Sequence, residues 1–410
     1  MKKTLNKRKI INDPIYGFVT LPDELIFDLI EHPYFQRLRR IKQLGMTNLV
    51  YPGALHTRFH HAIGAMYLMT EAIKVLQGKG IEITNEEVQG VTAAILLHDI
   101  GHGPFSHALE NSLVHGIHHE DISALLMDKL NSEFKGKLSL AIEIFNNKYK
   151  KKFLHQLVSG QLDMDRLDYL KRDSFFTGVS EGVISSDRII KMLNVVEGKL
   201  VVEEKGIYSI EKFIIARRLM YWQVYLHKTV LSAENLLVNI LLRAKELAEK
   251  KMKLFCSPAL EIFLYNRHDK SSFKKNPELI NEFARLDDYD IFSAIKVWAD
   301  CEDPILSYLC KSLISRKLFK IEIQNNSFDK KRIRELSQQI MKKFKIEENE
   351  LHYLFLNKSV SNEIYSVNKI GIGILFRDGK VKDISKSSDQ LNVEVLNKTV
   401  KKYFLCYPKI

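Results

Sequence analysis

The sequence predicts a mainly α-helical protein with a small α/β lobe at its C-terminal end. Across most of residues 22–320, apolar side chains recur about every 3.6 positions, which is the spacing of an amphipathic helix. Beyond that range, short alternating or apolar runs indicate strands, and the composition shifts near Ser315. We therefore expect a helical domain over residues 1–317 and an α/β lobe over residues 318–410.

The first domain is predicted to be built from successive helices and one hairpin. Helical spacing covers residues 25–31, 33–44, 59–76, 152–173 and 212–251. Pro33 separates the first two helices because proline cannot continue a helix that precedes it. The segment TNEE at residues 84–87 is a capping box, so a further helix starts there and ends near Gly101. Residues 194–210 alternate and contain glycines, which predicts a β-hairpin.

The C-terminal lobe is predicted to mix strands with one helix. Strand patterns cover residues 319–324, 352–357, 370–376 and 393–396. Residues 329–344 lie between the first two strands, have helical spacing and are strongly basic. The lobe is therefore expected to place a basic helix beside a small sheet.

The composition is that of an ordinary globular protein with an excess of positive charge. The chain has 410 residues, of which 45% are hydrophobic and 27% are charged, so a largely disordered chain is excluded. Lys and Arg total 62 and Asp and Glu total 50, which gives a net charge of +12. This excess favours phosphate-bearing partners such as nucleotides, nucleic acid or an anionic membrane. The alternative is a lysine-rich solvated surface without a specific partner.

The cysteines and the N-terminal segment bear on the compartment. Four scattered cysteines form no CxxC pair, which is typical of a reducing compartment and predicts no thiolate metal site. The N-terminal segment is basic but lacks an apolar run, so no signal peptide is predicted. No apolar stretch approaches the ~20 residues of a membrane span. We therefore expect a soluble, cytoplasmic protein without a membrane partner.

Histidines cluster in one part of the chain. Nine of the 14 histidines lie between His56 and His119. Among them, His98 and Asp99 stand side by side in the segment LLHDIGHG, at the end of an apolar helix. Such a pair offers a nitrogen and an oxygen ligand to one divalent cation. The alternative is a buried aspartate that caps the helix beside a core histidine.

Further polar residues upstream and downstream favour a metal site. The doublet His60-His61 precedes the pair, and Asp163, Asp165 and Asp168 follow it on an apolar helix. Burial of several acids is costly unless a cation or hydrogen-bond donors compensate. The order His…His-Asp…Asp resembles that of the HD-domain metal-dependent phosphohydrolases.

Within that group, the chain resembles the deoxynucleoside triphosphate triphosphohydrolases. The resemblance is carried by the segments NDPIYG at 12–17, FQRLR at 35–39, KQLG at 42–45, YPGA at 51–54, HTRFHH at 56–61, HDIGHGPFSH at 98–107, His119-Glu120, residues 163–173, and AR at 216–217 with YLHK at 225–228. It extends over roughly residues 9–240 and implies a helical HD-domain core. It also implies hydrolysis of a dNTP to deoxynucleoside and inorganic triphosphate, a phosphoric ester hydrolysis of EC 3.1.5 type.

The resemblance implies a set of metal ligands and of acid–base groups. The implied ligands are His61, His98, Asp99 and Asp165. Their chemistry suits Mg, Mn, Fe, Ni or Zn alike. The position of Arg58 favours His61 over His60 in the doublet. The implied acid–base groups are His119 with Glu120 as its partner, His102, and His107 as the alternative general acid. His118 has no counterpart in the family.

The resemblance further implies how the substrate is held. The phosphates are assigned to Arg58, Arg166 and Arg217, and the sugar is assigned to Gln43, Leu44, Tyr169, Asp173 and Tyr225. In vertebrate members the second of these arginines is a lysine, and arginine keeps the charge but changes the donor geometry. Leu44 and Tyr225 would crowd the 2′ position, which predicts a preference for deoxyribose. Core packing is the alternative role of both residues.

A regulatory site is also implied. In vertebrate members a guanine nucleotide binds at a subunit contact through residues that match Lys9, Glu31, Gln36 and Arg39, and an adjoining activator dNTP contacts residues that match Asn12 and Lys228. Glu31 replaces an aspartate. The family therefore implies activation by GTP or dNTP and a homotetramer. The alternative is that residues 1–45 form only an oligomer contact.

Two other classes of function compete with this interpretation. An HD-domain nucleotidase or cyclic-nucleotide phosphodiesterase would share the metal ligands but has no need of Gln43, Leu44 and Tyr225. A protein that binds single-stranded nucleic acid is the alternative from a different class, suggested by the net charge of +12 and the basic residues 330–345. Few aromatic residues accompany that stretch, so no base-stacking array is predicted.

Overall fold

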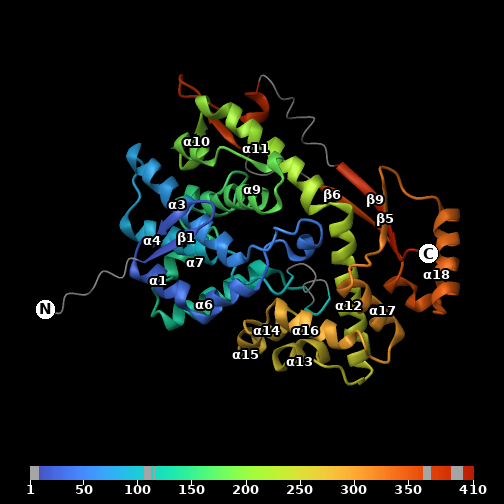
Figure 1. Ribbon diagram of the computed structural model, residues 1–410. Coiled ribbons are helices and arrows are strands. Elements are labelled where there is room, and N and C mark those ends of the chain that lie inside the picture. Colours follow the sequence, from blue (N-terminus) through green and yellow to red (C-terminus); the bar gives the residue numbers. More distant parts are fainter. Residues whose placement is uncertain (1–8, 106–111, 115, 363–370, 389–399) are drawn as a thin grey trace.

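The computed structural model describes residues 9–105, 112–114, 116–362, 371–388 and 400–410. The fold is mainly α-helical with a small α/β lobe at the C-terminal end, as the sequence predicts (Figure 1). In Figure 1 the long helix α12, Lys228–Glu249, runs between the helical bundle and the C-terminal sheet. None of the helices in the described ranges is both long and apolar enough to cross a bilayer.

The N-terminal segment forms a hairpin and two short helices. Strands β1, Ile10–Asp13, and β2, Gly17–Thr20, pair antiparallel, and α1, Glu24–Glu31, and α2, Pro33–Gln36, follow them. The helix predicted over residues 33–44 is wrong in its second half. After α2 comes a 3₁₀ turn that ends at Arg40, and the backbone N–H of Lys42 donates to the Asp288 carboxylate at 2.9 Å. This bond and the bridge from Lys42 to Thr57 take the place of helical hydrogen bonds.

The core of the molecule is a bundle of helices around α3. Its members are α3, Arg58–Gly78; α4, Asn85–Leu97; α6, His119–Glu133; α7, Ser139–Phe145; α8, Lys152–Val158; and α9, Met164–Thr177. The single helix predicted over residues 152–173 is two helices, α8 and α9. The break arises because the Asp163 carboxylate accepts from the backbone N–H groups of Gly160 and Arg166, so it caps a new helix.

The predicted hairpin forms, but it is shorter than expected. Strands β3, Leu193–Val196, and β4, Lys199–Glu203, pair antiparallel, and α11, Ile207–Met220, starts soon after. The helix predicted over residues 212–251 is interrupted by a π-helical turn, Tyr221–Tyr225, before α12 begins. His227 caps α12 by accepting from the N–H of Thr229 at 3.2 Å. The remaining helices are α10, Ser186–Lys191; α13, Pro258–Tyr265; α14, Lys270–Lys275; α15, Glu278–Phe283; α16, Asp288–Trp298; and α17, Pro304–Ile314.

The C-terminal sheet packs on α12. Its strand order is β5-β9-β6, with β5 at Lys320–Gln324, β6 at Leu356–Asn362 and β9 at Val400–Tyr407, and α18, Lys330–Phe344, is the predicted basic helix. The strand predicted over residues 352–357 is displaced, because a 3₁₀ turn extends to Tyr353. Strand β9 was not predicted, and the predicted strand at 393–396 lies outside the described residues.

Part of the C-terminal lobe pairs with the helical domain. Strands β7, Gly373–Leu375, and β8, Val381–Asp383, extend the β3–β4 hairpin into a sheet of order β3-β4-β7-β8, in which β7 runs parallel to β4. The chain after residue 318 therefore contributes to two sheets. The division into domains at that residue stays a prediction.

A candidate metal centre between α3, α4 and α9

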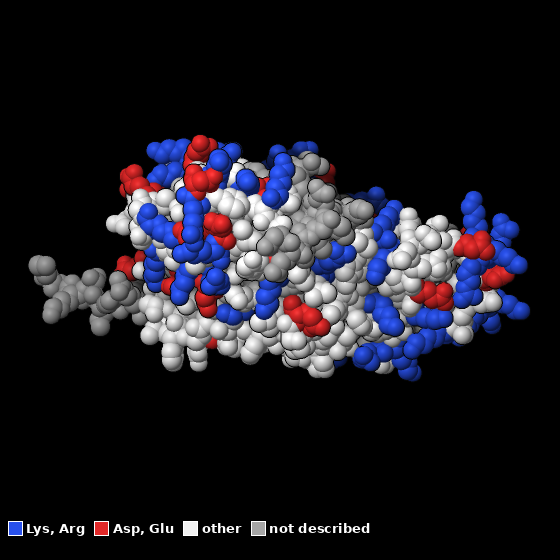
Figure 2. All heavy atoms as spheres, turned by 90° about the horizontal axis from the view of Figure 1, so that it is seen from above, with Lys and Arg blue, Asp and Glu red and all other residues white. Residues whose placement is uncertain are grey.

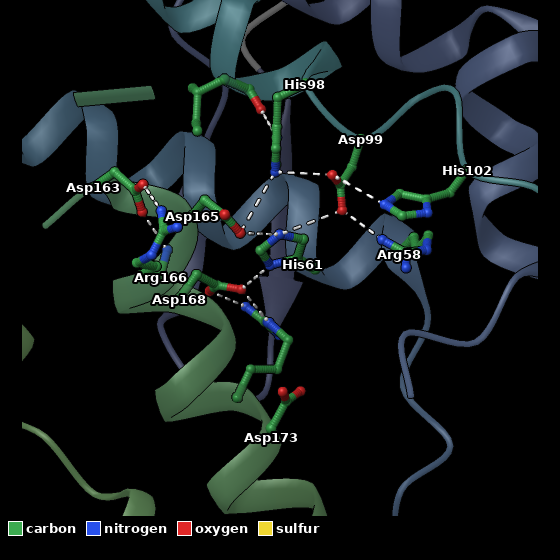
Figure 3. Close-up of polar contacts among 12 residues, drawn as sticks. Arg58, His61, His98, Asp99, His102, Asp163, Asp165, Arg166, Asp168 and Asp173 are labelled. Atoms are coloured by element: carbon green, nitrogen blue, oxygen red, sulfur yellow. Dashed lines mark hydrogen bonds and ion pairs between the residues drawn. The ribbon is translucent and has the colours of Figure 1, made fainter. Parts of the chain in front are cut away.

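The four predicted metal ligands come together from three helices. His61 lies on α3, His98 ends α4, Asp99 follows it directly, and Asp165 lies in the first turn of α9. In Figure 3 their polar atoms point toward one another across a small space. The structure thus assembles in space a set of residues that the sequence separates by more than a hundred positions.

Packing against α6 fixes the end of α4 that carries two of these residues. The Ser123 hydroxyl donates to the His98 carbonyl oxygen at 2.8 Å and accepts from the Gly101 N–H at 3.0 Å. A Cβ atom at Gly101 would lie 2.3 Å from the His119 carbonyl oxygen, so only glycine fits there. The motif HDIG therefore has a structural reason for its glycine as well as a chemical reason for its first two residues.

The donor atoms of His61, His98 and Asp99 all lie within 4.8 Å of one another, as ligands of one cation do, and Asp165 lies beside the two histidines. His61 Nε2 lies 3.1 Å from Asp165 Oδ1 and 3.9 Å from Asp99 Oδ2, and His98 Nε2 lies 3.4 Å from Asp99 Oδ1. Adjacent ligands at about 2.1 Å from an octahedral ion are about 3.0 Å apart. Both Nε2 atoms are buried and make no hydrogen bond of normal geometry. Two buried ring nitrogens without a hydrogen bond of normal geometry, facing two carboxylates, fit a divalent cation.

A buried chain of charged residues orients His61. Its Nδ1–H donates to Asp168 Oδ2 at 2.8 Å, and Arg172 donates to both oxygens of Asp168 at 2.9 Å. Arg172 in turn donates to the Asp13 carboxylate at 2.8 Å, which ties the network to the N-terminal hairpin. This arrangement places the His61 proton on Nδ1 and turns the Nε2 lone pair toward the cluster. His98 is oriented in the same way, because its Nδ1–H donates to the Ile95 carbonyl oxygen at 2.6 Å.

The doublet His60-His61 has one member in the cluster. His61 is completely buried, whereas His60 contacts the start of its own helix through Thr57, whose N–H donates to His60 Nδ1 at 3.2 Å. His60 therefore accepts a hydrogen bond from the residue that caps the N-terminus of α3, and it lies on a different side of the helix from the cluster.

The electrostatics of the cluster favour a bound cation. Burial alone would lower the pKa of His61, but the carboxylates of Asp165 and Asp168 overcome this effect and raise it to about 10. Burial would raise the pKa of Asp99, but the neighbouring histidines and Arg58 hold it well below its usual range. The carboxylates are thus ionised. In the metal-free state a second proton occupies Nε2 of His61, and a divalent cation would displace it.

A second histidine group flanks the cluster. The rings of His102 and His119 stack with centroids 3.8 Å apart, and His102 Nε2 lies 3.3 Å from Asp99 Oδ1. His119 Nε2 lies 3.4 Å from a carboxylate oxygen of Glu120. Burial and the nearby Arg58 lower the pKa of His102 to about 3, so it is neutral at physiological pH. His107 lies outside the described residues, and His118 is exposed at the start of α6.

The predicted phosphate-binding residues are three arginines with different surroundings. Arg58 donates to Asp99 Oδ2, and Arg166 forms an ion pair with the capping residue Asp163. Arg217 is buried on α11 and is close enough to the Tyr169 hydroxyl to oppose the rise in its pKa that burial causes. The three guanidinium groups therefore come from α3, α9 and α11, and Arg58 is the one that contacts a predicted metal ligand directly.

Three of the five predicted sugar-binding residues line one cavity together with Arg58, whereas Tyr169 and Asp173 lie behind its wall. This cavity measures about 750 Å³, and its walls include Gln43, Leu44, Arg58 and Tyr225. The Tyr225 hydroxyl donates to Asp173 Oδ2 at 2.7 Å, and the rings of Tyr169 and Tyr225 lie 6.2 Å apart. The structure thus places one predicted phosphate-binding arginine and three of the predicted sugar contacts in one cavity.

The residues of the predicted regulatory site are only partly brought together in one chain. Gln36 accepts from Arg39 Nε at 2.8 Å, and Glu31 is close enough to raise the pKa of Arg39 against the lowering effect of burial. The ammonium group of Lys9 lies over the Phe27 ring. Asn12 lies on β1 and Lys228 opens α12, which are different parts of the fold.

Several residues of the site were not singled out from the sequence. Arg172 and Asp13 complete the network behind His61, and His56 Nε2 contacts Asp173 Oδ1 at 2.8 Å. A signal for Arg172 was present, since it follows Asp168 by four residues on one helix, a spacing that places both on the same face. The sequence holds no signal that connects His56 or Asp13 with residues of α9.

The fold and the site define a metal-site phosphohydrolase of the HD type. A model of the HD domain matches residues 58–173, and a model of the HD associated region matches residues 184–256. The chain is 34% identical to the uncharacterized protein YwfO of Bacillus subtilis, over 99% of this chain and 93% of that protein. A crystal structure described as a phosphohydrolase from Bacteroides thetaiotaomicron is 54% identical, with a TM-score of 0.95, over 98% of this chain and 100% of that one.

Relatives of named activity match over a shorter range. The deoxynucleoside triphosphate triphosphohydrolase SAMHD1 homolog of Dictyostelium discoideum is 34% identical over 58% of this chain, which spans about half of that relative, 50%. The chain belongs to the HD-domain phosphohydrolases and is related to the SAMHD1 enzymes. The expected fold class, a helical HD-domain core with a small C-terminal α/β lobe, is confirmed.

Proposed function

We propose that the protein hydrolyses dNTPs to deoxynucleoside and inorganic triphosphate. One observation carries the proposal: a single cavity of about 750 Å³ joins Arg58, which contacts the cluster through Asp99, to Gln43, Leu44 and Tyr225. A plain phosphatase needs the charged end of this cavity but not its sugar-facing walls. The relationship to enzymes named deoxynucleoside triphosphate triphosphohydrolases supports the same substrate class.

The chemistry follows from the positions of the charged groups. His61, His98, Asp99 and Asp165 would hold the divalent ion, which when bound supplies Lewis-acid polarisation of the α-phosphate. Arg58, Arg166 and Arg217 would bind the phosphate oxygens. Water attacks the α-phosphorus, the bond from phosphorus to the 5′ oxygen breaks, and triphosphate leaves with the water oxygen.

The departing 5′ oxygen needs a proton. His119 is placed for this role, since Glu120 holds its ring and His102 stacks on its face. His102 is neutral and next to Asp99, so it would position the ring stack and donate to a phosphate oxygen. His107 stays the alternative general acid.

Deoxyribose selectivity belongs to the proposal. Leu44 and Tyr225 line the cavity, and the Tyr225 hydroxyl is fixed by Asp173. A 2′-hydroxyl would meet these side chains without gaining a partner, which disfavours ribonucleotides. We assign the 3′-hydroxyl to Gln43 and Asp173.

Regulation and assembly are further parts of the proposal. We propose a cytoplasmic homotetramer, activated by GTP or dNTP at subunit contacts through the residues around Glu31 and Arg39. The support is that Gln36 and Arg39 are already bonded to each other on one surface of the N-terminal segment. The metal is Mg, Mn, Fe, Ni or Zn, since the donor set suits each of these ions.

The test is a panel of dNTPs, singly and in pairs, with metal analysis of the purified protein. The proposal requires inorganic triphosphate as product from at least one dNTP or mixture. Release of phosphate or pyrophosphate would favour an HD nucleotidase, and hydrolysis of cyclic nucleotides would favour a phosphodiesterase.

The alternative from another class rests on α18. Figure 2 shows Lys and Arg gathered at the end of the molecule that α18 forms, and its exposed cations are Lys330, Lys331, Arg332, Arg334, Lys342 and Lys343. Binding of single-stranded DNA with a steep salt dependence, together with no triphosphate from any mixture, would favour this alternative over the enzyme.

A further inference from the structure

The C-terminal sheet contributes a lysine to the substrate cavity. Lys358 on β6 lines the same cavity as Arg58 and Tyr225, although it lies on a different layer of the fold. Its ammonium group donates to Asn235 Oδ1 on α12 at 3.4 Å. The amide of Asn235 is fixed, since its Nδ2 donates to the Leu231 carbonyl oxygen at 2.7 Å. The sheet thus adds a cation to a cavity whose other lining residues all lie between residues 43 and 242.

The position of Lys358 is set by the packing of the sheet on α12. Ser232 of α12 donates to the Phe319 carbonyl oxygen at 2.9 Å, and Asn239 of α12 donates to the Tyr353 carbonyl oxygen at 2.8 Å. All four residues are buried, so both bonds are shielded from water. Lys358 is therefore attached to a sheet that is fixed against the cavity wall.

Two further groups on α12 continue this wall. Glu234 and Val238 lie one turn apart and line the cavity together with Asn235. The wall therefore combines an ammonium donor from β6 with a carboxylate acceptor and an apolar surface from α12.

The proposed positions of the triphosphate and the sugar determine which part of a bound nucleotide contacts this wall. The triphosphate is drawn to Arg58 and the cluster, and the sugar is placed at Gln43, Leu44 and Tyr225. The base is attached to the sugar on the side away from the 5′ phosphates. The base therefore meets other lining residues of the cavity, and the polar ones among them that come from α12 and β6 are Glu234, Asn235 and Lys358.

We propose that this wall recognises the base and favours guanine; this inference rests on the proposed function. An ammonium group donates to the O6 and N7 atoms of guanine, and a carboxylate accepts from its N1–H and amino groups. Adenine presents an amino donor at the position of O6, which places two donors opposite each other and disfavours binding. Lys358 and Glu234 are thus specificity-determining residues, and Asn235 positions the lysine.

The experiment compares Lys358→Met with the intact protein on dGTP, dITP and dATP. We expect kcat/KM to fall about tenfold or more for dGTP and dITP, which both carry O6, with little change for dATP, which has an amino group at that position. Lys358→Arg restores the preference because it restores the donor. Glu234→Gln lowers the rate with dGTP more than with dITP, which lacks the amino group.

Lys401→Met is the matched control. Lys401 lies on the neighbouring strand β9 and is exposed, but it points to the opposite face of the sheet from Phe404, the residue opposite Lys358. This variant removes the same charge from the same sheet and leaves the ratio of dGTP to dATP turnover unchanged.

Equilibrium binding separates this inference from the proposed function. Dissociation constants for dGTP and dATP are measured on protein stripped of metal, in which turnover cannot occur. A preference for dGTP that Lys358→Met abolishes supports the inference even if no dNTP is hydrolysed. A ratio of dGTP to dATP binding or turnover that is the same in intact protein and in Lys358→Met overturns it, whatever reaction the enzyme catalyses.

Discussion

The network behind His61 provides a sharp test of the metal centre. In Asp168→Asn, a nearly isosteric side chain loses the charge that pairs with Arg172 and the second oxygen that Arg172 contacts. His61 then loses the ionised acceptor that fixes its proton on Nδ1. Loss of such a partner of a metal-bound histidine lowers metal affinity about 10- to 100-fold, or about 1.4–2.7 kcal/mol.

The same substitution also affects stability. Removal of one partner from a buried ion pair lowers the free energy of unfolding by about 3–5 kcal/mol. Because Arg172 keeps its contact with Asp13, we expect a loss of about 3 kcal/mol. Calorimetric titration of Mn²⁺ into metal-free protein measures the first effect, and thermal unfolding measures the second. Asp128→Asn, at an exposed position on α6, is the control. A folded Asp168→Asn protein with unchanged Mn²⁺ affinity would refute the assigned role of the network.

Three other predictions concern the same region. His119→Ala keeps the metal content but slows single-turnover cleavage by about 10²–10⁴, and an unchanged rate would move the acid role to His107. Gly64→Ala places a Cβ atom 2.0 Å from Asp168 Oδ1, so it lowers metal affinity and the melting temperature, whereas Gly78→Ala at an open site does not. Because the pKa of His61 is about 10 in the metal-free state, metal binding releases its proton. Mn²⁺ affinity therefore rises about tenfold per pH unit between about pH 6.5 and 8.5 for each proton released, and a flat profile would contradict this.

Much of the helical domain was predictable because local signals decide it. The capping box at Thr84 starts α4 one residue later, and the spacing of apolar residues marks α3 almost to its ends. The errors occur where tertiary partners replace local ones. The helix after Pro33 stops because Asp288, far along the chain, binds the N–H of Lys42. No local pattern contains that information.

The candidate site was predictable in its ligands and less so in its surroundings. The spacing of His61, the pair His98-Asp99 and Asp165 was readable through a family resemblance, and the structure brings these residues together. Asp163 also stood out from the sequence, but it caps α9. Lys358 could not be found, because its place in the cavity depends on how a distant sheet packs against α12.

The bond that breaks distinguishes a dNTP triphosphohydrolase from other phosphohydrolases. The protein is incubated with divalent metal and an intact dNTP that it hydrolyses, in water enriched in ¹⁸O. Both products are then analysed by mass spectrometry. We predict intact triphosphate that carries one ¹⁸O atom per turnover and deoxynucleoside that carries none. We also predict that Asp99→Ala forms neither product. Phosphate or pyrophosphate as the product, ¹⁸O in the deoxynucleoside, or full activity in Asp99→Ala would contradict these predictions.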